Sequence, residues 1–323
     1  MPVPARAENA GDGRTIANLR LDIPASVLPL RPAWIDATGI AAIHVIALLA
    51  FVPWFFSWVG VLLALLGLYV FGTLGISLCF HRMLTHRGVV CPKWLEHSFA
   101  ILGLCCVQDT PARWVGIHRR HHEHADKRSD PHSPLAGFLW SHIGWMLFRN
   151  RELVRLGLSS RYAKDVMRDP FYAKLEQKFR WVRVVLISWG CFFTSAFLAE
   201  MALQRGIPEA IRFSFSVLIW GVFVRTVLVW HITWSVNSVT HLWGYRNYGT
   251  NDSSRNNLIV GFLSNGEGWH NNHHAAPHSA RFGYRWWELD TTWLTIRLLA
   301  SLGLAWKIIT PSPPLAIKEA VER

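Results

Sequence analysis

The sequence predicts an all-α integral membrane protein, with four transmembrane helices in two hairpins and a large helical cap on one side of the membrane. Two observations predict this fold. Of the 323 residues, 51% are hydrophobic and only 17% are charged, whereas soluble domains carry about 25% charged residues. Four apolar stretches are also long enough to cross a bilayer, which takes about 20 residues of α-helix.

The four apolar stretches form two pairs, and a short corner joins the members of each pair. The predicted transmembrane helices cover residues 37–56, 58–79, 181–203 and 208–229. Pro53 and Trp54 mark the first corner, and the segment QRGIPEA marks the second. Because connections this short join antiparallel neighbours, each pair is expected to fold as a helical hairpin.

The basic residues predict the orientation of these hairpins. Of 33 Lys and Arg residues, 17 lie in residues 81–180, 8 lie in 231–323 and 4 precede residue 37. Segments on the cytoplasmic side of membrane proteins carry an excess of Lys and Arg. The N-terminal segment 1–36 and a cap made of residues 81–180 and 231–310 are therefore expected in the cytoplasm.

Residues 37–310 are interpreted as one membrane domain, and residues 311–323 as a flexible tail. The net charge of +12 could also indicate a nucleic-acid partner, but the basic residues lie between apolar stretches and form no nucleic-acid-binding motif. We therefore predict no such partner.

Arg225 lies inside the fourth predicted span, where a charge is costly in lipid. Its guanidinium could reach the cytoplasmic interface along the membrane edge. Alternatively, it could pair with a buried acid or line a cavity. The sequence leaves these two interpretations open.

The histidines gather in three boxes and one further segment. The boxes are HRMLTH, HRRHH and HNNHH, and a ninth histidine ends the segment NSVTH. The nine are His81, His86, His118, His121, His122, His241, His270, His273 and His274. At about 100° per residue, a helix directs the three imidazoles of HRRHH to one face, and likewise those of HNNHH. The two histidines of HRMLTH point about 140° apart, so they converge only where the helix ends or distorts.

Nine imidazoles on one side of the predicted membrane are too many for a single metal ion. Two six-coordinate ions would leave open positions for water or dioxygen. Imidazole ligands suit iron, copper, zinc and nickel. Oxygen chemistry at open positions favours iron, whereas a closed structural zinc site uses four ligands. The interpretation is a centre with two Fe²⁺ ions.

The other seven histidines receive a structural interpretation. His44, His97, His142, His231 and His278 are expected to be interfacial or hydrogen-bonded, and His124 and His132 are expected in exposed loops. A metal-bound imidazole usually donates its other N–H group to a carboxylate or a carbonyl. The candidate carboxylates near the boxes are Asp126, Asp130 and Glu267.

These motifs resemble the membrane fatty acyl desaturase family over about residues 37 to 306. HRMLTH, HRRHH with a trailing DPH, NSVTH and GEGWHNNHH stand in the family's order. The continuation HNNHHAAPHSARFGYRWWELD is most similar to Δ9-type members from bacteria, cyanobacteria and plastids. The resemblance implies an enzyme that uses O2 and two external electrons to form a cis double bond, at Δ9, in a saturated acyl chain on lipid or CoA.

The resemblance also implies roles for particular residues. The first iron would take His81, His86, His118, His122 and His273. The second would take His121, His241, His270 and His274, with Asn237 reaching it through a water molecule. The residues that match a bent acyl tunnel are Gln108, Trp114, Thr233 and Trp234, with Arg149 near the tunnel mouth.

One departure from the family pattern concerns the acyl carrier. Animal acyl-CoA members carry an Arg-Asp pair directly before the second box, where this chain has Gly116 and Ile117. The loss of a cation weakens recognition of a polyanionic carrier, which favours acyl groups on membrane glycerolipid. The resemblance further implies a bacterial inner-membrane location.

The chain carries no haem-binding or flavin-binding fingerprint. Electrons would therefore come from a separate donor, such as ferredoxin or a cytochrome b5-like protein. Two alternatives remain at this point: a related di-iron lipid or alkane hydroxylase, and a non-catalytic metal-binding membrane protein.

Overall fold

The computed structural model describes residues 20–311, and no β-strand occurs among them. Residues 1–19 of the predicted N-terminal segment and 312–323 of the predicted tail lie outside the described residues. The α-helices are α1 (Trp34–Ala47), α2 (Trp58–Gly67), α3 (Lys93–Leu104), α4 (Pro111–His124), α5 (Trp145–Leu147), α6 (Arg155–Tyr162), α7 (Lys164–Met167), α8 (Pro170–Leu175), α9 (Arg180–Ala202), α10 (Ile207–Leu218), α11 (Arg225–Ser238), α12 (Leu258–Leu263), α13 (His270–Ala275) and α14 (Thr291–Ser301).

Helical turns of other types interrupt or extend these α-helices. The π-helical segments are η5 (Leu68–Thr85), η7 (Trp140–Gly144) and η9 (Ile219–Val224). The 3-10 segments are η2 (Ala25–Val27), η3 (Leu48–Phe51), η4 (Pro53–Phe55), η6 (Pro134–Ala136), η8 (Arg151–Leu153) and η10 (Val239–His241). The prediction of an all-helical chain is therefore confirmed for the described residues.

Four helical stretches are long and apolar enough to cross a membrane, as predicted. They cover Trp34–Phe51, Trp58–Thr85, Arg180–Ala202 and Ile207–His241. The second and fourth stretches have 28 and 35 residues and run well past their predicted ends. At about 1.5 Å per residue they are about 42 and 52 Å long, against a hydrocarbon core of about 30 Å. Helices of this length can carry the ends that bear His81 and His241 beyond the core.

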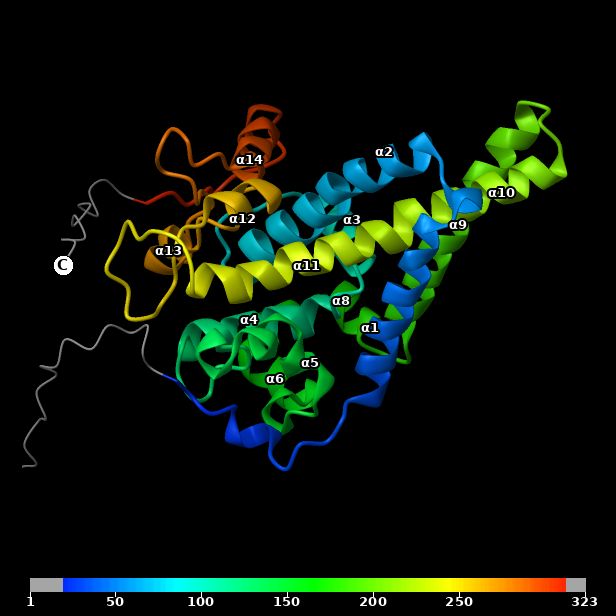
Figure 1. Ribbon diagram of the computed structural model, residues 1–323. Coiled ribbons are helices and arrows are strands. Elements are labelled where there is room, and N and C mark those ends of the chain that lie inside the picture. The colour runs from blue at the N-terminus through cyan, green and yellow to red at the C-terminus, as the bar shows by residue number, and fades with distance from the viewer. Residues whose placement is uncertain (1–19, 312–323) are drawn as a thin grey trace, which may run out of the picture.

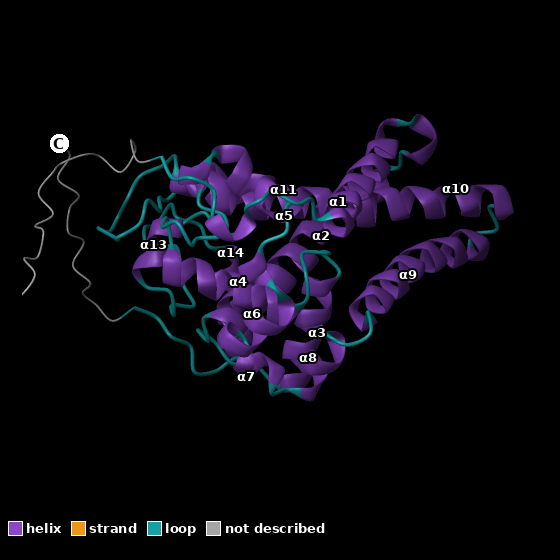
Figure 2. Cartoon of the chain, turned by 90° about the horizontal axis from the view of Figure 1, so that it is seen from below, coloured by secondary structure: helices purple, strands orange, loops and turns teal. Residues whose placement is uncertain are grey.

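The molecule is long in one direction. Helices α9 and α10 lie at one end, and the short helix α13 lies at the other (Figure 1; Figure 2 shows the same from below). In Figure 1, α4 and α6 lie on one side of α11, and α12 and α14 lie on the other. The end of α11 that leads to His241 therefore runs beside α4, which carries the HRRHH box.

The π-helical geometry of η5 explains how the HRMLTH box works. In a π-helix each N–H group bonds to the carbonyl five residues earlier, and the His86 N–H donates to the His81 carbonyl at 3.1 Å. Residues five apart therefore lie on one face. The two imidazole centroids are 4.9 Å apart. The spacing of HRMLTH predicted that these two histidines converge only where the helix ends or distorts, and the π-helical geometry is such a distortion.

Close packing between two glycines fixes η5 against α3. A methyl group built on Gly75 would lie 2.5 Å from the Cα atom of Gly103. The two backbones can approach this closely only because neither residue has a side chain. Gly75 lies six residues before His81, so this contact sets the position of the first histidine box.

Arg225 follows neither of the two interpretations that the sequence left open. It is fully buried, so it does not reach the interface. Its guanidinium carbon lies 3.8 Å from the centroid of Phe71, and its Nη2 donates to the Cys105 carbonyl at 3.0 Å and to Thr226 Oγ1 at 3.1 Å. No acid pairs with it among the described contacts. An aromatic face and a carbonyl dipole stabilise this cation instead.

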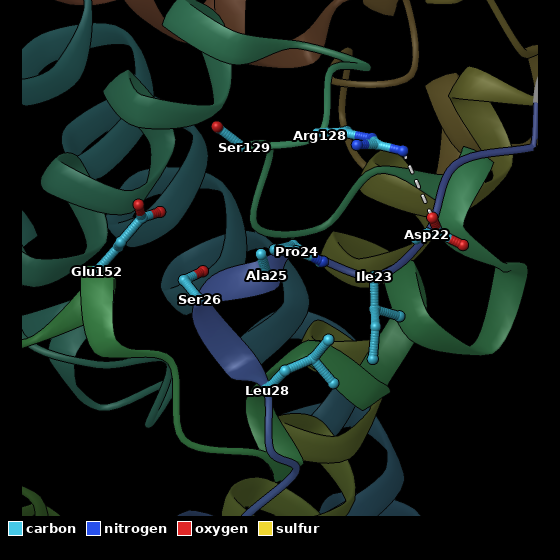
Figure 3. A pocket seen from close by; sticks show the side chains of 9 residues that line it. All are labelled: Asp22, Ile23, Pro24, Ala25, Ser26, Leu28, Arg128, Ser129 and Glu152. Carbon is cyan, nitrogen blue, oxygen red and sulfur yellow. Dashed lines mark ion pairs between the residues drawn. The ribbon is translucent and has the colours of Figure 1, made fainter.

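The segment that precedes α1 runs across the cap. Arg151 donates to the carbonyl of Leu28 at 3.0 Å, and the Arg149 N–H donates to the carbonyl of Arg31 at 2.8 Å. Figure 3 shows Asp22 pointing toward Arg128 over a small pocket between this segment and the cap. Their charged atoms are 3.6 Å apart. The segment is therefore tied to the cap at several points.

Gly75→Ala tests the glycine contact. The added methyl group would push α3 away from η5, and overpacking of this kind typically costs about 1–3 kcal/mol. We expect a lower unfolding temperature of the purified, detergent-solubilised protein, measured by intrinsic tryptophan fluorescence. Gly190→Ala on α9, where nothing lies within 4 Å of the new methyl, is the matched control. Equal unfolding temperatures for the two variants would contradict the proposed role of the contact.

Candidate metal centre

Four separate elements bring the nine histidines together. His81 lies near the end of η5 and His86 directly follows it, α4 carries the HRRHH histidines, η10 ends at His241, and α13 carries the HNNHH histidines. All nine side chains are buried or half-buried. The histidines form two groups, and within each group one ring nitrogen of every member lies within 4.8 Å of the others. The groups are His81, His86, His118, His122 and His273, and His121, His241, His270 and His274.

These two groups have the same members as the two sets that the family resemblance assigns to two irons. In the first group, His273 Nε2 lies 3.1 Å from His81 Nε2 and 2.9 Å from His122 Nε2. His122 Nε2 lies 3.1 Å from His118 Nε2. The Nε2 atom of His86 is buried without a hydrogen-bond partner among the described residues.

The second group is smaller and equally tight. His270 Nε2 lies 3.1 Å from His241 Nε2 and 3.1 Å from His274 Nε2. His121 Nε2 is buried and has no hydrogen-bond partner within the described chain. Both groups thus direct their Nε2 atoms inward.

Four carboxylates contact the Nδ1 atoms of four imidazoles, on the side of each ring opposite to the inward-facing Nε2 atom. Asp130 lies 3.0 Å from His121 Nδ1, and Asp126 lies 2.9 Å from His241 Nδ1. Glu267 contacts His81 Nδ1. These three acids are the ones that the sequence predicted for this role. In each pair the imidazole N–H donates to the carboxylate, which fixes the orientation of the ring.

The fourth carboxylate is Asp252, which the sequence analysis missed. Its Oδ2 atom lies 2.8 Å from His274 Nδ1. Asp252 belongs to a polar loop between η10 and α12 and stands in none of the histidine boxes. In the sequence, Asp252 is only an acidic residue in a loop between NSVTH and HNNHH, so no motif marks it as a partner of a histidine.

The partners of the ring nitrogens explain why a cation fits here. His121, His241 and His274 face carboxylates through Nδ1, so each carries its proton on Nδ1 and a lone pair on Nε2. The lone pairs of His241 and His274 both face the Nε2 atom of His270. A neutral His270 could donate one N–H group there and satisfy only one of the two contacts. An electron-pair acceptor at the centre of the group removes the remaining repulsion.

The pKa shifts of four histidines in the two groups favour neutral imidazole, and the pKa of Glu267 favours an ionised carboxylate. Burial, reinforced by the neighbouring imidazoles, lowers the pKa of His118, His122, His270 and His273 well below the ordinary value. Burial alone would raise the pKa of Glu267, but the adjacent His81 and Arg82 lower that pKa to about 2. Neutral imidazole is the form that binds metal ions.

A buried arginine holds Glu267 in place. Arg82 Nη2 donates to Glu267 Oε1 at 2.9 Å, and Arg82 Nη1 donates to Asp290 Oδ2 at 2.9 Å. Its guanidinium carbon lies 3.9 Å above the centroid of Phe282. Arg82 therefore positions His81 through Glu267, a role for the arginine of HRMLTH that the sequence analysis did not propose.

The two asparagines of HNNHH hold α13 to the surrounding loops. Asn271 Oδ1 accepts from the backbone N–H of Asn247 at 2.8 Å. Asn272 Oδ1 accepts from the Nδ2 groups of Asn247 and Asn256, and Asn272 Nδ2 donates to Glu288, each at 2.8 Å. Since α13 has only six residues, these bonds stabilise a helix that is too short to be stable alone.

A cavity of about 890 Å³ extends from the first histidine group. His81, His118 and Glu267 line its inner part, and α1 and α11 contribute to its wall. All five residues that match tunnel positions, and Asn237, lie on this wall: Gln108, Trp114, Arg149, Thr233, Trp234 and Asn237. Gln108 Nε2 donates to Thr233 Oγ1 at 3.0 Å. Most of the lining is apolar, which suits an alkyl chain.

The seven histidines outside the two groups differ in their surroundings. His132 is buried, stacks on His121 with a centroid distance of 4.4 Å, and lines the cavity. The prediction of an exposed loop was therefore wrong for His132, because the loop that carries it folds under α4. His124 is half-buried beside Glu123. The other five are hydrogen-bonded: His44, His97, His142, His231 and His278.

Sequence comparisons identify the family. The family described as "Fatty acid desaturase" matches residues 54–306. The sn-1 stearoyl-lipid 9-desaturase of Synechocystis sp. is 44% identical over 87% of this chain and 82% of its own length. The sn-2 palmitoyl-lipid 9-desaturase of Nostoc sp. is 41% identical over 87% and 91%, and the acyl-CoA C20 Delta5-desaturase of Anemone leveillei is 41% identical over 84% and 80%. The chain therefore belongs to the fatty acid desaturase family.

Proposed function

We propose that this protein introduces a cis double bond at Δ9 of saturated acyl chains on membrane glycerolipids. Membership of the family makes the chain an oxygen-dependent desaturase. The names of the relatives support the double-bond position and the lipid as acyl carrier, since those from Synechocystis sp. and Nostoc sp. are lipid 9-desaturases. Acyl-CoA is the second candidate carrier, because the Anemone leveillei relative is named for it.

The facing lone pairs of the two histidine groups carry the proposal of a metal centre. One Fe²⁺ ion would be held by His81, His86, His118, His122 and His273. The other would be held by His121, His241, His270 and His274, with Asn237 reaching it through a water molecule. When bound, the iron pair supplies the oxygen chemistry that removes two hydrogens from adjacent methylene groups.

The protein's own residues bind and orient the acyl chain. The acyl chain would lie in the 890 Å³ cavity, where Trp114 and Trp234 offer flat apolar walls. The hydrogen bond between Gln108 and Thr233 would define the bend of the chain. Arg149 would face the head group at the mouth. Geometry of this kind decides which carbon atoms lie beside the metals.

The surroundings of Gly116 support glycerolipid as the carrier. A methyl group on Gly116 would lie 2.8 Å from Leu158 Cγ, so α6 leaves no room there for a cationic side chain. Ile117 packs with Leu153 and Leu158 in a small apolar cluster. Neither position offers a charge to the phosphates of CoA, which are bound through charge-assisted contacts.

We also propose that the four apolar helices form two hairpins in the bacterial inner membrane, with the cap in the cytoplasm. The Lys and Arg residues of the cap support this orientation. Two electrons per turnover would come from a separate protein, a ferredoxin or a cytochrome b5-like carrier. A basic cap would attract such an acidic carrier.

Expression in a desaturase-deficient host tests the function. We expect monounsaturated acyl chains with the double bond at Δ9, found in glycerolipids before they appear in the CoA pool. Mass spectrometry of separated lipid classes, with the double-bond positions mapped, measures this. A product that has gained an oxygen atom would instead identify a hydroxylase, and unsaturation that appears first in the CoA pool would identify acyl-CoA as the substrate.

His121→Ala and His273→Ala test the metal centre. Each variant removes one inward-facing nitrogen, so we expect loss of double-bond formation and a fall in iron content of roughly one ion per chain. Elemental analysis of purified protein and gas chromatography of cellular fatty acids measure the two effects. His97→Ala, which alters a histidine bonded to Asp169, is the control. Full iron content in either test variant would contradict the assignment.

Asp252→Asn tests the carboxylate found only in the structure. An amide accepts the His274 N–H less strongly than a carboxylate, and the loss of such a partner typically costs 10–100-fold in metal affinity or activity. We expect about tenfold lower activity and easier removal of iron by a chelator. Asp22→Asn, at an exposed position, serves as the control. Wild-type resistance to the chelator would exclude a role of Asp252 at the metal centre.

A further inference from the structure

His278 joins the protein surface to the first histidine group. The residue is exposed, yet its ring reaches inward, and its Nδ1–H group donates to the backbone carbonyl of His86 at 2.8 Å. The ring centroids of the two residues are 6.4 Å apart. His278 belongs to neither of the two groups and lies past the end of α13. It is therefore an exposed side chain that contacts a proposed metal ligand without being one.

Three segments that are far apart in the sequence meet around His278. A methyl group built on Gly88 would lie 2.8 Å from the carbonyl oxygen of His278, so these two residues are in close contact. The Ile309 N–H donates to the Gly88 carbonyl at 2.8 Å, and the Ala280 N–H donates to the Ile309 carbonyl at 2.7 Å. These backbone contacts hold the three segments side by side.

Helix α7 borders the same surface. Arg87, which directly follows His86, donates from Nε to Asp165 Oδ2 on α7 at 3.1 Å. Arg119 on α4 donates from Nη1 to Asp165 Oδ1 at 2.7 Å. Two guanidinium groups therefore share one carboxylate. In Figure 2, α7 lies at the edge of the cap, away from α10.

The surface around His278 is basic, and its exposed cations define what we call the basic face: Arg87, Lys164, Arg168 and Lys307. Asp165 is the only acid in the segments 86–90, 164–168, 275–281 and 306–309, and two arginines already neutralise it. Asp169, the next acid after α7, is paired with Lys93 at 3.1 Å. A positive potential therefore remains on the basic face.

A basic surface that contacts a metal ligand fits an electron carrier. Positive charges steer an acidic protein to the surface and fix its orientation there. Electron tunnelling through protein becomes steeply slower with distance, so a carrier must dock where a metal ligand comes close to the surface. Anionic lipid would also be attracted by the cations of the basic face. A lipid surface, however, gains nothing from the contact between His278 and His86.

We propose that the basic face is the docking surface of an acidic one-electron carrier protein, and that electrons enter the metal centre through His278 and His86. The proposal rests on the proposed function, which needs an external donor. Each docked carrier is oxidised by one electron, so two carriers dock in succession. Their two electrons, two protons and the two hydrogens of the acyl chain reduce one O2 to two water molecules.

Binding of a carrier tests the basic face without relying on activity. The probe is oxidised plant-type ferredoxin, an acidic iron–sulfur protein, added to the full-length Zn²⁺-loaded protein in phosphatidylcholine nanodiscs and followed by biolayer interferometry. We expect Lys164→Glu combined with Arg168→Glu to slow association about tenfold, since electrostatic steering raises on-rates by roughly 10- to 1000-fold. High ionic strength should remove most of this difference, because salt screens exposed charges.

Arg128→Glu is the matched control, because Arg128 is exposed and lies beside Asp22 over the pocket in Figure 3. Association of the double variant at the wild-type rate would overturn the docking surface. Nanodiscs that contain phosphatidylglycerol test the attraction to lipid. If the charge reversals weaken stabilisation by this anionic lipid but leave ferredoxin binding intact, the cations serve the membrane and the proposal fails.

Rapid kinetics of the iron-loaded protein test the entry point. Under anaerobic conditions we expect His278→Ala to oxidise reduced ferredoxin several-fold more slowly, measured by the absorbance of ferredoxin. Ferredoxin binding, iron content and the rate of reduction by dithionite should keep their wild-type values, because this small reductant needs no docked carrier.

Two results would contradict entry through His278. One is an unchanged rate of ferredoxin oxidation by His278→Ala. The other is equal slowing with ferredoxin and dithionite, which would show a merely structural role. If the unaltered protein binds and oxidises ferredoxin but forms no double bond, the proposed function fails and the docking surface stands.

Discussion

The repulsion between inward-facing imidazole lone pairs is the constraint on which the rest of this structure depends. Nine buried or half-buried rings direct nitrogen atoms toward two points, with Nε2 atoms about 3 Å apart. Contacts on the outer side of the rings oppose this repulsion. Asp126, Asp130, Asp252 and Glu267 provide such contacts for four rings, and Arg82 in turn supports Glu267. The carboxylates come from three loops, since Asp126 and Asp130 share one, so the rings can meet only where these three loops come together.

The sequence predicted those parts of the site that depend on local periodicity. His118, His121 and His122 share a face because α4 is a regular helix, and spacing alone shows this. The convergence of His81 and His86 could not be predicted in the same way, since it depends on the π-helical hydrogen bonding of η5. Neither residue carries a local signal for that geometry, which we attribute to packing against α3.

The parts of the site that the sequence missed depend on how loops pack. Asp252 lies far from every box in the chain, and only the folding of its loop against α13 brings it to His274. His132 was expected in solvent because its neighbours are polar, yet the turn around Asp130 buries it under His121. Four apolar helices were predicted correctly from composition. The ends of the second and fourth were less accurate, since the residues that follow these two spans continue the same helix.

The 18-residue π-helical segment η5 has a consequence for protein engineering. The two histidines of HRMLTH are five residues apart, so they share a face only while the backbone keeps the wider turn of a π-helix. A designer who copies the boxes onto regular four-helix bundles would place the two histidines of HRMLTH on different faces and obtain an incomplete site. A transplanted centre must therefore include the η5 backbone together with its glycine contact to α3, so the smallest portable unit is a pair of packed helices rather than a motif.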